Sequence, residues 1–194
     1  MKNFVEKNKI KKLFFAIISE LICFFIIRIN LIKYDTNNLY LSAMNIVQIL
    51  YFLPILLLYI FFYISKKVNK KLLIFSTMGL IIYSIFLHFC ITPITSFFTN
   101  TPGIINFTKY ASKIYFICLP LISFRIFIIF NCDLNYVYFL TRFILFTLIT
   151  FIFDYYFGLK GILYSNPLCE LLYFIFSLYM LFQNKAIFIQ SHNI

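Results

Sequence analysis

Long apolar segments alternate with short polar ones along nearly the whole chain. A membrane-spanning helix needs about 20 apolar residues, and six segments reach that length, at approximately 13–32, 39–64, 72–91, 108–130, 137–157 and 161–183. The connections between them are short, so neighbouring helices are expected to run antiparallel. The pattern predicts an all-α membrane protein with six transmembrane helices in residues 13–183, flanked by tails at 1–12 and 184–194.

The composition agrees with a lipid environment. Hydrophobic residues make up 63% of the chain and charged residues only 12%, whereas a soluble domain carries roughly 25% charged residues. A soluble domain of 194 residues could not hide so much apolar surface from water. The lipid bilayer is therefore the expected surroundings of this chain.

The charge distribution predicts the orientation in the membrane. Nine of the 17 basic residues fall in the tail at 1–12 and in SKKVNKK at 65–71, and both clusters lie beside long apolar segments. This arrangement is typical of cytoplasmic loops and favours them over a nucleic-acid site. We expect a multi-pass protein of the cell membrane with both tails in the cytoplasm and no nucleic-acid partner.

Several kinds of chemistry have no support in the sequence. Its five cysteines form no CxxC pair, and its two histidines have no ligand-spaced partner, so neither a disulfide framework nor a metal site is expected. No phosphate-binding glycine loop occurs, and no nucleophile and base stand in an arrangement typical of an active site. The chain is expected not to be an enzyme and to need no cofactor.

Acidic residues lie inside the predicted spans. Glu20 is the eighth residue of the first segment, roughly 10 Å into the helix, where a charge costs at least about 2.5 kcal/mol. Arg28 is about 80° out of register with it, so we do not pair the two. Glu20 is either a carboxylate that exchanges H⁺ or Na⁺ or a structural acid bonded to a neighbouring helix. Glu170 lies midway along the last span, whereas Asp154 is near a span end and is expected to be solvated.

Prolines and amides mark further candidate positions. Pro54, Pro120 and Pro167 interrupt apolar segments and are expected to kink their helices. Such kinks are either hinges or static bends. Glu170, Asn45 and Gln48 are candidates for a polar site within the membrane.

Four segments resemble the carboxyl-terminal half of MATE (multidrug and toxic compound extrusion) transporters. FGLKGILYSNPLCELLYFIFSLYMLF resembles the last helix of that family, in which a Gly-Leu-x-Gly turn precedes a proline and then a polar or acidic residue. SFFTNTPGIINFTKYASKIYFICLPLISF, YFLTRFILFTLITFIF and NNLYLSAMNIVQILYFLPILLL are similar to earlier segments of the same half, in the same order. The resemblance covers roughly residues 38–183.

The resemblance implies a function for the chain. It would form one six-helix lobe of a secondary transporter that exports organic cations or drugs in exchange for H⁺ or Na⁺, with Glu20 as the cation-coupling residue and Arg142 as a structural or headgroup anchor. Members of the family have two such lobes, so a second six-helix lobe is expected, as a separate chain or a second copy. Arg125 stands where some members carry an acid, and the glycine-rich segment that follows the second helix is missing.

Two alternatives stay open beside the exporter. One is a remnant or structural membrane subunit that transports nothing. The other is a flippase of the same superfamily for lipid-linked saccharides, in which Arg28, Arg125 and Arg142 would bind the anionic cargo.

Overall fold

The structure is a computed structural model that describes residues 2–35, 37–65, 68–131 and 136–183. All regular secondary structure in these residues is helical. The helices are α1 (Lys2–Ile32), α2 (Leu39–Ile64), α3 (Lys70–Phe98), α4 (Pro102–Phe116), α5 (Leu119–Asn131), α6 (Tyr136–Phe157) and α7 (Leu159–Gln183). Five helices are long and apolar enough to cross a membrane, and there are six if the bent pair α4 and α5 is counted as one span. The predicted all-α membrane fold is confirmed.

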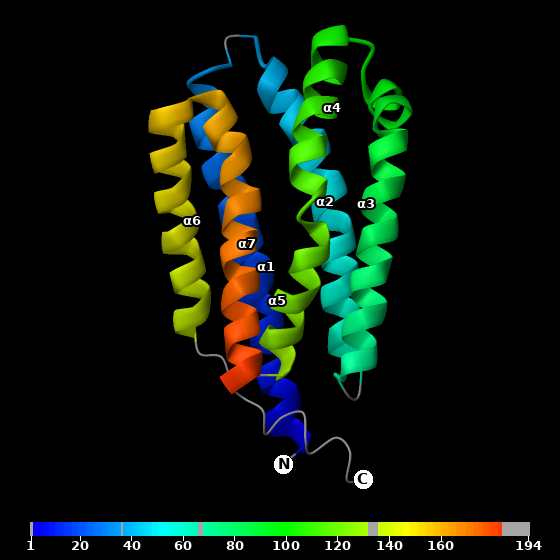
Figure 1. Ribbon diagram of the computed structural model, residues 1–194, viewed down its shortest axis with the longest axis vertical. Coiled ribbons are helices and arrows are strands. Elements are labelled where there is room, and N and C mark those ends of the chain that lie inside the picture. Colours follow the sequence, from blue (N-terminus) through cyan, green and yellow to red (C-terminus); the bar gives the residue numbers. More distant parts are fainter. Residues whose placement is uncertain (1, 36, 66–67, 132–135, 184–194) are drawn as a thin grey trace.

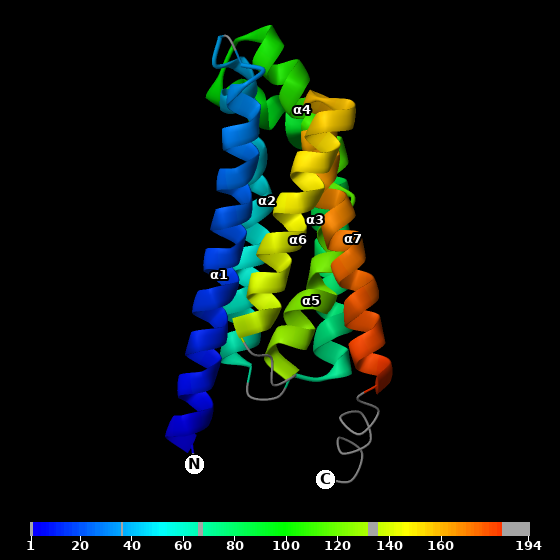
Figure 2. The same ribbon diagram turned by 90° about the vertical axis from the view of Figure 1, so that its left-hand side faces the viewer.

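The spans form one elongated bundle in which α1 begins and α7 ends at the same end (Figures 1 and 2). Helix α7 packs against α6, α5, α4 and α1, whereas α2 and α3, although consecutive in the chain, touch each other at few points. Both α2 and α3 pack instead on the bent pair α4 and α5. The bent pair α4 and α5 therefore connects α2 with α3 in the bundle.

One face of each helix is buried and the other is apolar and exposed. On α2 the buried positions include Met44, Tyr51 and Tyr59, and the opposite face exposes Leu53 and Leu57. The buried residues recur about every turn, as they do on the inner face of a packed helix. An exposed face of this kind suits acyl chains and not water, which fits the expected membrane environment.

Three helix boundaries differ from the expectation. Helix α4 begins at Pro102, six residues before the predicted start of the fourth span at 108. Helix α1 begins at Lys2, so the described part of the basic tail continues the first span as helix. Helix α3 runs on to Phe98, seven residues beyond the predicted end at 91, because Pro93 removes only one hydrogen-bond donor and the turns around it stay helical. The predicted tail at 184–194 lies outside the described residues.

The prolines behave in two ways. Helices α4 and α5 meet at an angle of 46° across a break at residues 117–118, just before Pro120. Pro120 then lies in the first turn of α5, where proline interrupts no hydrogen bond within α5 itself. The chain is thus broken next to Pro120, whereas Pro54 and Pro167 lie within continuous helices.

Two glycines make the tight turn from α6 to α7. Gly158 has φ 57°, a left-handed conformation that glycine adopts without steric cost. At Gly161 a Cβ atom would collide with the backbone carbonyl of Phe153 on α6. Glycine is therefore required at both positions, by the turn at the first and by the close approach of two helices at the second.

Candidate functional site

Two glutamates and two arginines from four helices meet inside the bundle. They are Glu20 of α1, Arg125 of α5, Arg142 of α6 and Glu170 of α7, and each side chain is 1% exposed. We call these residues the four-charge cluster. Their formal charges cancel.

Each carboxylate of the cluster contacts both guanidinium groups. Nη2 of Arg142 lies 3.0 Å from Oε2 of Glu20 and 2.8 Å from Oε1 of Glu170. Nε of Arg125 donates to Oε2 of Glu170 over 3.1 Å. Nη2 of Arg125 lies 2.5 Å from Oε1 of Glu20 but out of line for a hydrogen bond, so this contact is an ion pair. Removing any one member would leave the cluster with one uncompensated buried charge, which is strongly unfavourable.

Neighbouring hydroxyl groups complete the coordination of the arginines. Arg142 donates from Nη1 to Ser19 Oγ over 2.8 Å, and Arg125 donates from Nη1 to Tyr59 Oη over 3.2 Å. Nε of Arg142 has no acceptor among the described groups. The cluster is therefore held by direct contacts, and two of its donor atoms, Nε of Arg142 and Nη2 of Arg125, have no hydrogen bond among the described residues.

Buried polar groups lie on both sides of the cluster along α7. Asn166 Nδ2 is one turn before Glu170, and the hydroxyls of Tyr173 and Ser177 are one and two turns after it. No described residue meets strict hydrogen-bonding geometry with these atoms, although Tyr51 lies within reach of Asn166 and Tyr138 within reach of Ser177. Polar groups of this kind are usually satisfied by ordered water. The interior along α7 is therefore polar over about 16 Å, at 1.5 Å per residue from Asn166 to Ser177.

The carbonyl groups that two prolines release are both satisfied by α3. Pro54 cannot donate to the carbonyl of Leu50, and the Tyr83 hydroxyl donates to that oxygen over 2.9 Å. Pro120 cannot donate to the carbonyl of Phe116, and Ser84 Oγ donates there over 2.6 Å. Adjacent residues of α3 thus connect the interruption in α2 with the break between α4 and α5.

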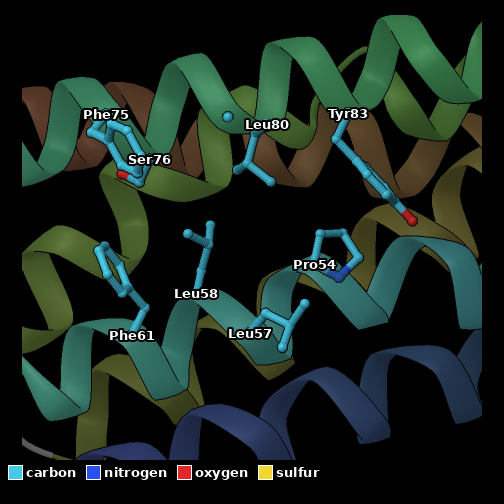
Figure 3. A pocket seen from close by; sticks show the side chains of 9 residues that line it. Pro54, Leu57, Leu58, Phe61, Phe75, Ser76, Leu80 and Tyr83 are labelled. Atoms are coloured by element: carbon cyan, nitrogen blue, oxygen red, sulfur yellow. The ribbon is translucent and has the colours of Figure 1, made fainter.

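An apolar groove separates α2 from α3 near Pro54. Figure 3 shows Leu57, Leu58 and Phe61 of α2 facing Phe75 and Leu80 of α3, with Tyr83 and Pro54 at one end. The wall carries almost no polar surface, because the Ser76 hydroxyl bonds to the carbonyl of Leu73 in its own helix. The groove suits lipid tails and offers no group that would bind an ion.

The candidate residues from the sequence are divided between two places. Glu20 and Glu170 come together in the four-charge cluster, whereas Asn45 and Gln48 line a groove between α1 and α2 and form no hydrogen bond with Glu170. Arg28 lies in that groove and not beside Glu20, in agreement with the register argument. No group of three His, Cys, Asp or Glu side chains among the described residues could hold a metal ion.

The expectation that Asp154 is solvated is wrong. Its side chain is 9% exposed and lies 2.7 Å from Lys33 Nζ, and Tyr34 donates to its Oδ1 over 2.7 Å. The residues after α1 fold back over the end of α6 and cover the carboxylate. The hydrogen bond to Asp154 raises the pKa of Tyr34 above its ordinary value.

The sequence interpretation missed the two arginines as partners of the acids. Part of this pairing could have been predicted from how far each residue lies from the end of its helix. Measured from the helix ends at the α6–α7 turn and the end of α1, Glu20, Glu170 and Arg142 lie about 18, 17 and 23 Å deep at 1.5 Å per residue. Opposite charges at similar depth in different spans are candidates for pairing.

Comparison with known proteins identifies no family for this chain. No protein-family model matches the chain, and neither the curated proteins nor the solved structures contain a match. The class is that of a helical protein with five or six helices fit to span a membrane. The resemblance to MATE transporters stays a prediction.

Proposed function

We propose that the chain is one lobe of a MATE-like secondary transporter. Together with a second six-helix lobe, either a separate chain or a second copy, it would exchange H⁺ or Na⁺ for an organic cation or amphipathic drug. The four-charge cluster is the observation that carries this proposal. Ionisable residues inside the membrane are rare, and in transporters they mark ion and proton pathways.

The contacts of Glu20 define how an ion would act on the lobe. Its two oxygens lie against Arg125 and Arg142, so a coupling ion competes with two guanidinium groups for the same carboxylate. A proton on Glu20 leaves the cluster with one uncompensated positive charge. Protonation then favours a conformation in which one arginine leaves the cluster or is hydrated. The protein shifts from the present conformation toward that second one.

Helix α5 is the element best placed to respond. It carries Arg125, is only 13 residues long and follows the break at residues 117–118. Interrupted helices beside an ion site are a recurring feature of secondary transporters. The Ser84 contact at the break would be the hydrogen bond that holds α5 in the present orientation.

The cargo would bind where this lobe meets the second one. Aromatic side chains make up 22% of the chain, and their faces attract organic cations. Binding of the cargo in one state and of the coupling ion in the other gives alternating access.

Transport by reconstituted protein tests the proposal. The chain, with any partner lobe that co-purifies, is placed in proteoliposomes, and export of a cationic dye is followed under an imposed H⁺ or Na⁺ gradient. Export should occur with the parent and be lost with Glu20→Gln. Asp154→Asn is the matched control, because it removes a carboxylate at the edge of the bundle and should leave export unchanged. Equal export by Glu20→Gln and the parent would overturn the coupling role.

The structural-subunit alternative is favoured by one observation, the cancellation of charges in the cluster. A neutral cluster can fix the packing of four helices without binding any ion. In that case parent and Glu20→Gln proteoliposomes would both fail to export dye, and a six-helix partner would still co-purify. A coding sequence for six further helices directly upstream would favour a split transporter, and one broken by stops would favour a remnant.

The flippase alternative gains less support. Two of its three candidate arginines, Arg125 and Arg142, are engaged by carboxylates in the cluster, and only Arg28 faces a groove.

A further inference from the structure

The groove between α1 and α2 is polar at one end and apolar at the other. It has a volume of about 470 Å³. Its polar residues, Arg28, Asn45 and Gln48, lie toward the end of the bundle where α1 ends and α2 begins, and its apolar residues lie deeper. The positions on each helix are three or four residues apart, so each helix presents a continuous stripe to the groove.

The polar end has unused hydrogen-bonding capacity. Neither Arg28 nor Asn45 has a hydrogen bond or ion pair with any residue that the structure describes. Gln48 donates its amide to the carbonyl of Phe24 over 3.4 Å, a long contact. The groove therefore offers one full positive charge and one free amide, with no acidic side chain in its wall.

The depth of the polar end matches a lipid headgroup. Arg28 is four residues before the end of α1 at Ile32, which places its Cα about 6 Å inside the helix end at 1.5 Å per residue. Its long side chain can extend from there to the membrane interface. A phosphate at the interface is therefore within reach of the guanidinium.

The deeper part of the groove matches an acyl chain. Phe25 of α1 and Ile49 of α2 are 63% and 64% exposed, and Phe52 lies beyond them. From Arg28 to Leu21 the stripe on α1 extends about 10 Å. This apolar track starts below the charge and leads toward the middle of the membrane.

We propose that the groove between α1 and α2 binds one anionic phospholipid. Its phosphodiester contacts Arg28 and Asn45, and one acyl chain lies along Phe25, Ile49 and Phe52. Arginine binds phosphate oxygens through charge-assisted, bidentate hydrogen bonds. An organic cation would meet the charge of Arg28 and is excluded from the polar end. The site is independent of the proposed transport activity.

Lipid binding to the purified protein tests the site directly. The chain is delipidated in detergent and titrated with phosphatidylglycerol, and bound lipid is counted by native mass spectrometry. Arg28→Gln should weaken the apparent Kd at least fivefold, and Asn45→Leu should weaken it less. Arg28→Lys keeps the charge and should retain part of the affinity. Lys109→Gln is the matched control, because it removes an exposed positive charge from α4 and should bind as the parent does.

Four results would overturn the site. The first is equal phosphatidylglycerol affinity for Arg28→Gln and the parent. The second is competition by free glycerol phosphate at the lipid's own concentration, which would mean a phosphate site that makes no use of the apolar track. The third is cross-linking of a photoreactive acyl chain to helices other than α1 and α2. Binding of phosphatidylglycerol only after a partner lobe has been removed would likewise overturn the proposal, because a protein would then occupy the groove.

Discussion

Tyr83 of α3 donates a hydrogen bond to the carbonyl oxygen of Leu50 in α2 over 2.9 Å. That oxygen would be bonded within α2 if residue 54 were not proline. The side chain of one helix thus replaces a backbone bond of another. Because Ser84 does the same for Phe116, α3 satisfies both interruptions through two consecutive residues.

A double-mutant cycle tests the Tyr83 contact. Tyr83→Phe removes only the hydroxyl and should destabilise the protein by about 1 kcal/mol, because a membrane-buried carbonyl loses its donor. In a Pro54→Ala background the new N–H of residue 54 bonds the Leu50 carbonyl, so Tyr83→Phe should then cost much less. Melting in detergent measures the four forms. Equal losses in both backgrounds would show that the hydroxyl does not serve the proline.

The four-charge cluster should be sensitive to any change that unbalances it. Arg142→Met leaves two glutamates with one guanidinium, and breaking a buried pair costs roughly 3–5 kcal/mol. The melting temperature should fall sharply. The double variant Arg142→Met with Glu170→Met restores the balance between Glu20 and Arg125 and should be more stable than Arg142→Met alone. If the double variant melts below the single one, the charge balance is not what stabilises these helices.

Two glycines should respond in opposite directions to the same substitution. Gly161→Ala drives a Cβ into the carbonyl of Phe153 and should destabilise the protein by separating α6 from α7. At Gly79, within α3, a Cβ atom would meet no neighbouring atom within 4 Å, and Ala there should be neutral or stabilising by up to about 1 kcal/mol. Melting of the two variants side by side gives the answer. A stable Gly161→Ala form would contradict the close approach of α6 and α7.

The orientation that the lysine clusters predict can be measured on whole cells. In a cysteine-free background, Thr101→Cys places a thiol on the exposed connection between α3 and α4, and Ser65→Cys places one after α2. A membrane-impermeant maleimide should label residue 101 and leave residue 65 unlabelled until the cells are opened. The reverse pattern would refute the cytoplasmic placement of the amino terminus.

The positions of single helices can be predicted from the sequence because they depend on local apolar length. The expected second span, 39–64, coincides with α2, and the interruption near Pro120 follows from the chemistry of proline. The predicted end of the third span at 91 is too early, because the turns around Pro93 stay helical as far as Phe98. A proline therefore marks the end of a helix only where the neighbouring helices also allow the chain to bend.

The partners of the buried acids depend on information that no single segment contains. The depth of Glu20 is readable from its place in the first span, but its contacts with Arg125 and Arg142 require α5 and α6 to lie beside α1. Asp154 illustrates the same limit, because the residues that cover it, Lys33 and Tyr34, are 121 and 120 positions away in the chain. The local sequence pattern indicates how deep an acidic residue lies in its span, whereas its partner depends on which helices pack together.

The four-charge cluster is assembled in a fixed order during biosynthesis. The ribosome delivers Glu20 first, then Arg125 and Arg142, and Glu170 only with the last helix. Until α7 enters the membrane, two guanidinium groups share one carboxylate, and the bundle carries an unbalanced positive charge. A chain that lacks α7 would keep that unbalanced charge. The charge of the cluster is therefore neutralised only when the last helix, which carries Glu170, has been inserted.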